Sequence, residues 1–182
     1  MNPHSLNAAL RSAGAAVKAV DLVMSGEANR AFCNVRPPGH HAGRTSAAGF
    51  CIFNNVAVAA AYVLEHYGLQ RVAIADFDVH HGNGTEEIFY NDVHVMLRST
   101  FRHPYYPYCG ADSGNNHIIN DPLPLEVLAW SFVPLSVITG CLHWKNFNQS
   151  FFLSRQVSMH IGTTRSLPLD YLHEAFTASP KN

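Results

Sequence analysis

The segment FDVHHGNGTEE, residues 77–87, holds the side chains of this chain that are best suited to chemistry. Residues two apart share one face of an extended strand, so Asp76, Asp78 and His80 point the same way if a strand runs to residue 80. A carboxylate and an imidazole at that spacing can bind one divalent ion, and mixed oxygen and nitrogen donors suit zinc. We therefore predict that Asp78 and His80 are metal ligands and that Asp76 orients a neighbouring imidazole.

A second histidine pair, His40 and His41, lies in the loop RPPGHHAGRTSAAGF, residues 36–50. Beside a metal, such a pair can supply one general base and one group that stabilises charge. One histidine pair by itself is most often an ordinary turn or surface feature. Two pairs, each after a predicted buried strand, favour a functional site over that interpretation.

Helices are the first elements that must position these side chains. Apolar residues at three-to-four spacing predict a helix over residues 5–25. The alanine-rich segment 53–67 predicts a second helix, which Gly68 ends. Thr85 is predicted to cap a third helix, with two acidic residues well placed against its dipole, Glu86 and Glu87.

Strands are predicted to alternate with these helices, at residues 31–35, 71–79 and 93–99. The middle one is apolar on both faces until its end, which is typical of a central strand in a parallel sheet. The alternation indicates an α/β fold. In such a fold the carboxyl ends of the strands are where ligands bind, and both histidine pairs follow strand ends.

Composition excludes several classes of function. The chain has 182 residues and a formal net charge of -1 without a basic run, so one domain is expected, with no direct nucleic-acid binding. Four cysteines without CxxC spacing indicate reduced thiols in a cytoplasmic protein. The apolar segment 127–142 is short and contains Pro134 and Gly140, so no membrane helix is predicted. The sequence does not indicate an oligomeric state.

Several motifs in order resemble the histone deacetylase superfamily, in particular its class II-like and bacterial acetylpolyamine amidohydrolase branch. The resemblance covers about residues 2–125 and includes RPPGHHA at 36–42, GFCIFNNVAVAAAY at 49–62, ADFDVHHGNGTEEIFY at 75–90, STFRHPYYPYCG at 99–110 and GNNHIIN at 114–120. It implies a three-layer arginase–deacetylase-like fold with a central parallel sheet. It also implies an enzyme that uses one zinc ion per site to hydrolyse acetylated lysine, an acetylated polyamine or another acetylated amine.

Carried over position by position, the resemblance assigns a role to each residue of the two histidine motifs. Asp78 and His80 match the first two zinc ligands. His41 matches the general base that activates the metal-bound water. His40 matches the electrostatic partner of that base, and Asp76 matches the carboxylate paired with His40.

The resemblance also assigns supporting residues. Phe50 and Tyr106 match two aromatic residues that wall the narrow tunnel for the acyl-lysine chain. Asn83 occupies a position where some branches have aspartate and class II-like members have asparagine. The strand at 75–80 and Ser99 match a structural potassium site.

The sequence departs from the family pattern in two ways. It has neither the later aspartate motif of the AGFDAH type, which supplies the third zinc ligand, nor the Gly-Gly-Tyr loop whose tyrosine stabilises the oxyanion. Asp121 lies where relatives tend to have an apolar residue, and an alternative alignment places Asn116 at the ligand position. Two protein ligands are too few for a tight catalytic zinc site, and an oxyanion donor is worth about 3 kcal/mol or more. We therefore expect a weak or inactive hydrolase.

The composition of the sequence changes after about residue 125, since only seven of the 25 charged residues lie in 122–182. We predict a partial deacetylase-like domain over 1–125 and a divergent tail over 126–182. Met1 matches a position well inside the family domain, so the fold is expected to be truncated and incomplete at both ends. The alternative function is a non-catalytic remnant that acts at most as a metal-binding or interaction module. A compensating ligand set in the tail is a weaker alternative, because the spacing fits no usual motif for His143, His160 and His173.

Overall fold

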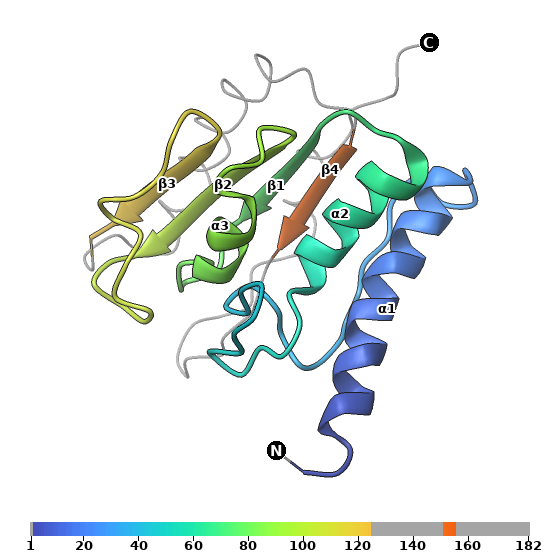
Figure 1. Cartoon of the computed structure of the whole chain (residues 1–182), viewed down its shortest axis with the longest axis horizontal. Coiled ribbons are helices and arrows are strands. Elements are labelled where there is room, and N and C mark those ends of the chain that lie inside the picture. The colour runs from blue at the N-terminus through green and yellow to red at the C-terminus, as the bar shows by residue number, and fades with distance from the viewer. Residues whose placement is uncertain (1, 125–150, 156–182) are drawn as a thin grey trace, which may run out of the picture.

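The computed structural model of the chain describes residues 2–124 and 151–155. The elements follow in the order α1 (Ser5–Met24), α2 (Asn55–Tyr67), β1 (Val72–Asp76), α3 (Asn83–Phe89), β2 (Val95–Arg102), β3 (Ile118–Leu123) and β4 (Phe151–Arg155). The strands form one parallel sheet in the order β3-β2-β1-β4 (Figure 1). The predicted α/β class and the parallel sheet are therefore confirmed.

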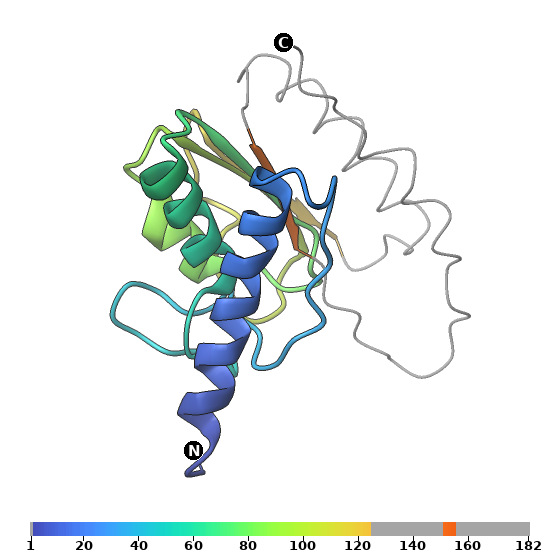
Figure 2. The same ribbon diagram turned by 90° about the vertical axis from the view of Figure 1, so that its right-hand side faces the viewer.

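The helices lie on one face of this sheet, where the hydrophobic core forms. In Figures 1 and 2, α2 and α3 cover β1 and β2, and α1 packs along α2 on the β4 side. The core contains α2 residues together with fully buried strand residues such as Ile74, Leu97 and Ile118. Burying one such side chain stabilises the fold by about 1.5–3 kcal/mol. This packing holds β1 and β2, and with them the strand ends that carry the site.

The ends of α2 explain why this helix is predictable. Its first free N–H groups need an acceptor, and the Asn54 side chain accepts from the amide of Ala57 at 3.1 Å. Gly68 ends the helix in the left-handed conformation, with φ at 67°, which glycine adopts without steric cost. The predicted helices at 5–25 and 53–67 are confirmed to within two residues at their ends.

The prediction of a strand at 31–35 is wrong. In the described part of the chain this segment has no ladder partner, and the Phe32 side chain is 88% exposed. The thiol of Cys33 lies 3.4 Å from the carbonyl oxygen of Ala15, so the segment runs alongside α1. A short apolar run shows that burial is possible, but a strand also needs a neighbouring strand to bond with, and the run does not specify one.

Two predictions at the end of β1 also need correction. The strand ends at Asp76, not at residue 79, so the period-two argument does not apply to the residues that follow. Helix α3 begins at Asn83 after Gly82, and Thr85 lies inside it instead of capping it. The Thr85 hydroxyl group receives a hydrogen bond from the Asn54 side chain at 3.1 Å, which ties α3 to the start of α2.

Part of the segment expected to be a divergent tail contributes a strand. β4 pairs with β1 in parallel, and Val72 stands opposite Phe151. The apolar segment 127–142 and the three tail histidines lie outside the described residues.

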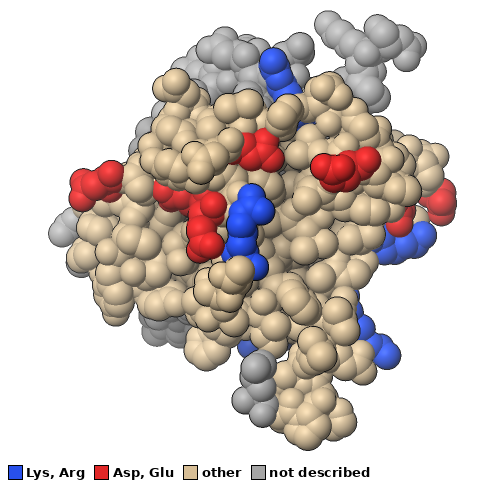
Figure 3. All heavy atoms as spheres, viewed as in Figure 1, with Lys and Arg blue, Asp and Glu red and all other residues tan. Residues whose placement is uncertain are grey.

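None of the helices in the described ranges is long and apolar enough to cross a membrane. The face in Figure 3 carries basic and acidic side chains interspersed, without a large patch of either sign.

Candidate functional site

The candidate site lies where β1 and β2 end. Asp76 is the last residue of β1 and stands opposite Ser99 of β2 in the register. The loop between β1 and α3, residues 77–82, continues from there. The loop 36–50 and the loop after β2 converge on the same edge, as expected at the carboxyl ends of parallel strands.

His40 and Asp76 form a buried pair. The His40 Nδ1 atom donates to Asp76 Oδ2 at 2.8 Å, and both residues are about 2% exposed. Asp76 also accepts from the backbone N–H of Asp78, with Oδ1 at 3.2 Å. Because the carboxylate only accepts, it holds the proton of His40 on Nδ1. The pairing predicted for these two residues is therefore present in the geometry.

His41 has a neutral partner. Its Nδ1 atom donates to the amide oxygen Oδ1 of Asn83 at 2.9 Å, so Nε2 is the ring nitrogen that can accept a proton. The His41 ring lies 3.9 Å from the His40 ring, measured between centroids. Tyr106 packs against it edge to face, with centroids 4.9 Å apart. Thus Asn83 and Tyr106 both lie beside the residue that the sequence assigns as a base.

The backbone around the two histidines is fixed by α3 and α2. Gly84 and Thr85 donate their backbone N–H groups to the carbonyl of His40 at 3.0 and 3.1 Å. The Asn54 amide donates to the carbonyl of Ala42 at 3.0 Å. Gly49 has φ at 52°, and a Cβ atom there would lie 2.2 Å from the His41 ring, so only glycine fits.

Asp78 and His80 lie in the loop after β1. The Asp78 side chain is 2% exposed, and its Oδ1 atom accepts from the backbone N–H of His80 at 2.8 Å. His80 Nδ1 lies 3.3 Å from the same oxygen. The His80 ring is 6.1 Å from the His41 ring, measured between centroids. A turn, and not a continued strand, therefore brings the two predicted metal ligands together next to His41.

These two donors do not complete a zinc site. Oxygen and nitrogen donors suit zinc, which needs at least three protein ligands in a catalytic site. Among residues 2–124 and 151–155, no group of three or more His, Cys, Asp or Glu side chains is arranged to hold a metal ion. The described residues thus do not fit a tight zinc centre.

Three further predicted residues lie near these histidines in different settings. Phe50 follows Gly49 and is 92% exposed, whereas Tyr106 is 38% exposed and packs on His41. Ser99 is buried beside the end of β1, with its hydroxyl oxygen 3.4 Å from His81 Nδ1. The tunnel and potassium roles of these residues remain predictions.

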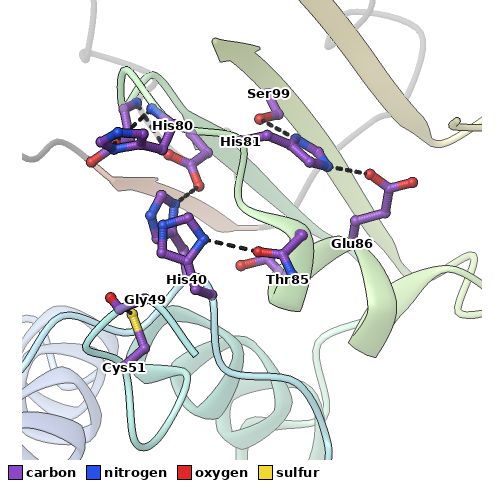
Figure 4. Close-up of polar contacts among 12 residues, drawn as sticks. His40, Gly49, Cys51, His80, His81, Thr85, Glu86 and Ser99 are labelled. Atoms are coloured by element: carbon purple, nitrogen blue, oxygen red, sulfur yellow. Dashed lines mark hydrogen bonds and ion pairs between the residues drawn. The ribbon is translucent and has the colours of Figure 1, made fainter. Parts of the chain in front are cut away.

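A second buried imidazole–carboxylate pair was not predicted from the sequence. His81 Nε2 donates to Glu86 Oε2 at 2.7 Å, and the two side chains are 2% and 9% exposed. Figure 4 shows the His81 ring between Ser99 of β2 and Glu86 of α3. In the sequence, Glu86 stands out only as an acidic residue at a predicted helix start. The signal available in the sequence was the position of His81 directly after His80, a predicted metal ligand.

The pKa of Glu86 reflects two opposed effects. Burial raises it, but hydrogen bonds from His81, Ser113 and Asn120 together outweigh burial and leave the pKa below its ordinary value. The Asn120 amide bond measures 2.9 Å. The carboxylate is therefore the form that the folded state stabilises. This pair ties the loop of the candidate ligands to both α3 and β3.

Comparison with known proteins identifies the lineage of this arrangement. A sequence profile of the histone deacetylase domain matches residues 1–134. A probable deacetylase of Archaeoglobus fulgidus is 45% identical over 122 residues, which cover 64% of this chain and 34% of that protein. Type-2 histone deacetylase 1 of Dictyostelium discoideum is 48% identical over 124 residues, covering 64% and 8%. Polyamine deacetylase HDAC10 of Rattus norvegicus is 44% identical over 118 residues, covering 62% and 20%.

The chain thus spans about a third or less of the length of these relatives. The crystal structure of the HDA15 HD domain superimposes with a TM-score of 0.76 at 33% identity, covering 85% of this chain and 47% of that one. This likeness confirms the expected arginase–deacetylase-type fold. The profile match and the deacetylase relatives agree with the two histidine motifs, and the chain belongs to the histone deacetylase family.

Proposed function

We propose that this chain carries the proton-transfer part of a deacetylase site and acts on acetylated lysine or a related acetylated amine. The observation that supports the proposal is the adjacent pair of histidines with different partners, His40 on a buried carboxylate and His41 on an amide oxygen. Two adjacent imidazoles, tilted by 46° and with distinct partners, can divide the work of a base and a charge stabiliser.

His41 is the base in this proposal. Its Nε2 atom takes a proton from a water molecule as the water oxygen bonds to the acetyl carbon. The carbon–nitrogen bond then breaks, and the His41 imidazolium returns the proton to the departing amine nitrogen. The products are acetic acid and the free amine, which ionise in solution to acetate and the protonated amine, and His41 regains its starting form. Asn83 keeps the opposite nitrogen of the ring protonated throughout.

His40 supports the charged form of His41. The two rings lie 3.9 Å apart, so a positive charge on His41 is within reach of the negative charge that Asp76 presents through His40. The site is almost dry here, since His40 and Asp76 are about 2% exposed, and low solvent access strengthens such interactions. Tyr106 covers the edge of His41 and excludes water from one side.

In this proposal, hydrolysis by the chain depends on zinc and is slow. Asp78 and His80 are the residues that would contact a divalent ion, and a bound ion would polarise the acetyl carbonyl. With two donors in the described residues, affinity for zinc is expected to be weak. Hydrolysis by the chain alone is accordingly expected to be slow and to require excess zinc.

The zinc content of the purified chain after dialysis tests this proposal, with Asp78→Ala as the control variant. We expect less than one zinc per chain, together with slow hydrolysis of an acetyl-lysine peptide that excess zinc accelerates and Asp78→Ala abolishes. One retained zinc per chain that is lost in Asp78→Ala would overturn the weak-binding part. Hydrolysis absent at every zinc concentration would overturn the enzymatic proposal.

The second candidate function is a non-catalytic binding module. The two-donor geometry of Asp78 and His80 favours it, because the described residues do not complete a catalytic ligand set. Under this alternative the chain binds an acetylated peptide with unchanged affinity in His41→Ala, and it shows no turnover. The hydrolysis assay above therefore separates the two functions.

A further inference from the structure

Two residues in the described part of the chain combine an unusual backbone with an exposed aromatic ring. Among residues 2–124, the non-glycine residues with positive φ are Phe50, at 65°, and Tyr108, at 64°. Both are aromatic, and their side chains are 92% and 73% exposed. Left-handed backbone is unfavourable for side chains other than glycine, and an exposed ring gains little burial to offset it. Folding therefore does not explain why these positions carry rings.

Each of these two residues is connected to His41 through one intervening residue, on the solvent side of it. Phe50 follows Gly49, whose backbone packs directly against the His41 ring. The Tyr108 ring contacts Tyr106 edge to face, with centroids 6.1 Å apart and planes at 81°, and Tyr106 in turn contacts His41. Two separate loops thus present an exposed aromatic side chain beside the same histidine.

The turn that carries Tyr108 is built to display this ring. The Tyr108 backbone N–H donates to the carbonyl of Tyr105 at 2.8 Å, which fixes the chain direction at this point. The side chain of Tyr106 points inward to His41, whereas that of Tyr108 remains in solvent. Tyrosine offers a large, rigid surface with few rotatable bonds, so ordering it on a ligand costs little conformational entropy. These properties suit a contact surface for a substrate.

We propose that Tyr108 is a specificity-determining residue that contacts the part of an acetylated substrate lying outside Tyr106. An acetylated peptide has backbone and neighbouring side chains in that region, whereas a small acetylated amine does not. Tyr108 therefore favours acetylated peptides over small acetylated amines. This inference rests on the proposed function, because it presumes that an acetylated chain reaches His41.

Binding of two probes to the whole chain tests the inference without relying on turnover. The first probe is a fluorescently labelled short peptide with one acetyl-lysine, and the second is monoacetylated cadaverine, measured by competition. In Tyr108→Gly we expect the peptide to bind about three- to tenfold more weakly, the usual worth of one aromatic contact. Binding of acetylcadaverine should change less than twofold. The melting temperature should not fall, because glycine adopts the left-handed backbone readily.

Tyr105→Ala is the matched control, since Tyr105 is an exposed tyrosine of the same loop and makes no ring contact within the described residues. It should leave the preference for the peptide unchanged. Equal weakening of both probes in Tyr108→Gly, no weakening of the peptide, or a lowered melting temperature would each overturn the specificity role. If the unaltered chain binds neither probe, the proposed function fails and this inference fails with it. If the peptide binds equally well to the unaltered chain and to Tyr108→Gly, only the inference fails.

Discussion

At the scale of single residues, the two adjacent histidines differ through their partners. His40 faces a carboxylate and His41 faces a neutral amide, although both make a hydrogen bond of nearly the same length through Nδ1. A carboxylate stabilises positive charge on its neighbour, whereas an amide orients a ring without adding charge. The proposed roles, with His41 as the base and His40 as its support, use that difference.

Replacing Asp76 with asparagine should change the proton position on His40. The new amide can place N–H₂ toward His40 Nδ1, which favours the tautomer with the proton on Nε2. We expect a change in the ¹⁵N ring shifts of His40, and hydrolysis reduced by about 10²-fold or more. Asp92→Asn is the matched control, because Asp92 makes an exposed 2.8 Å pair with His94 beside the start of β1, at the opposite end of the strand from Asp76. Unchanged ¹⁵N ring shifts of His40 in Asp76→Asn would contradict the pairing of His40 with Asp76.

Replacing Asn83 separates orientation from charge. Asn83→Ala removes the acceptor that holds His41 Nδ1, and loss of such an orienting partner lowers activity by about 10- to 100-fold. Asn83→Asp keeps an oxygen at the same position, so it should retain more activity than the alanine variant. Comparison of kcat for the three chains checks this. Equal kcat in the two variants would show that the acceptor oxygen does not position His41.

At this scale the sequence predicts which side chains meet but not how. Tandem histidines after predicted strand ends indicated that His40, His41 and Asp76 belong together. The structure places them so, although residues 31–35 form no strand. The His81–Glu86 pair was missed because its members are five residues apart across the turn that begins α3. Neither a strand period nor a helix period brings such residues together, so only the folded turn reveals the contact.

At the scale of elements, Asn54 joins three segments around the site. Its side chain caps α2 through Ala57 and donates to Ala42 and Thr85. Asn54→Ala should lower the free energy of unfolding by about 2–4 kcal/mol, from the lost cap and the buried polar groups left unpaired. Urea denaturation measures this loss. The exposed Asn29→Ala should change it by less than about 0.5 kcal/mol.

The hydrogen bond from Asn120 of β3 to Glu86 of α3 should make the free energy of unfolding depend on pH. The pKa of Glu86 is lower in the folded state than its ordinary value, so the folded chain binds that proton less readily. Its contribution is fully present above the ordinary carboxyl pKa of about 4.3, and it is lost as pH falls through the folded pKa.

Glu86→Gln should therefore lower the free energy of unfolding by about 1–3 kcal/mol near neutral pH, and the difference should shrink in acid. Urea denaturation at a series of pH values checks this. Glu65→Gln, at an exposed position on α2, is the control. A difference between wild type and Glu86→Gln that is constant with pH would show that packing, and not the carboxylate charge, stabilises this contact.

Elements with their own end signals were predictable, and those that depend on a distant partner were not. α2 carries its own cap and its own terminal glycine, so its limits follow from local sequence. The segment 31–35 has the composition of a strand but no ladder partner among the described residues. β4 pairs with β1 from nearly eighty residues away, and no local pattern indicates that pairing.

At the scale of the whole molecule, metal affinity depends on how many donors the complete fold brings to one point. The described residues bring two, Asp78 and His80, to the end of β1. A ligand stabilises a protein by RT ln(1 + [L]/Kd), so zinc at a tenth of Kd adds only about 0.06 kcal/mol. Zinc at a hundred times Kd, as expected for a three-ligand site, would add about 2.7 kcal/mol.

Added zinc at about 10 μM should therefore raise the melting temperature by less than about 1 °C, and a chelator should not lower it. Thermal unfolding followed by circular dichroism, with and without zinc, measures this for the chain and for Asp78→Ala. The twelve histidines of the chain can bind zinc nonspecifically, and Asp78→Ala subtracts that effect. A rise of several degrees that Asp78→Ala abolishes would mean that the fold supplies a third donor from beyond the described residues. In that case the two-donor limit would no longer apply, and the slow rate expected of this chain would lose its physical basis.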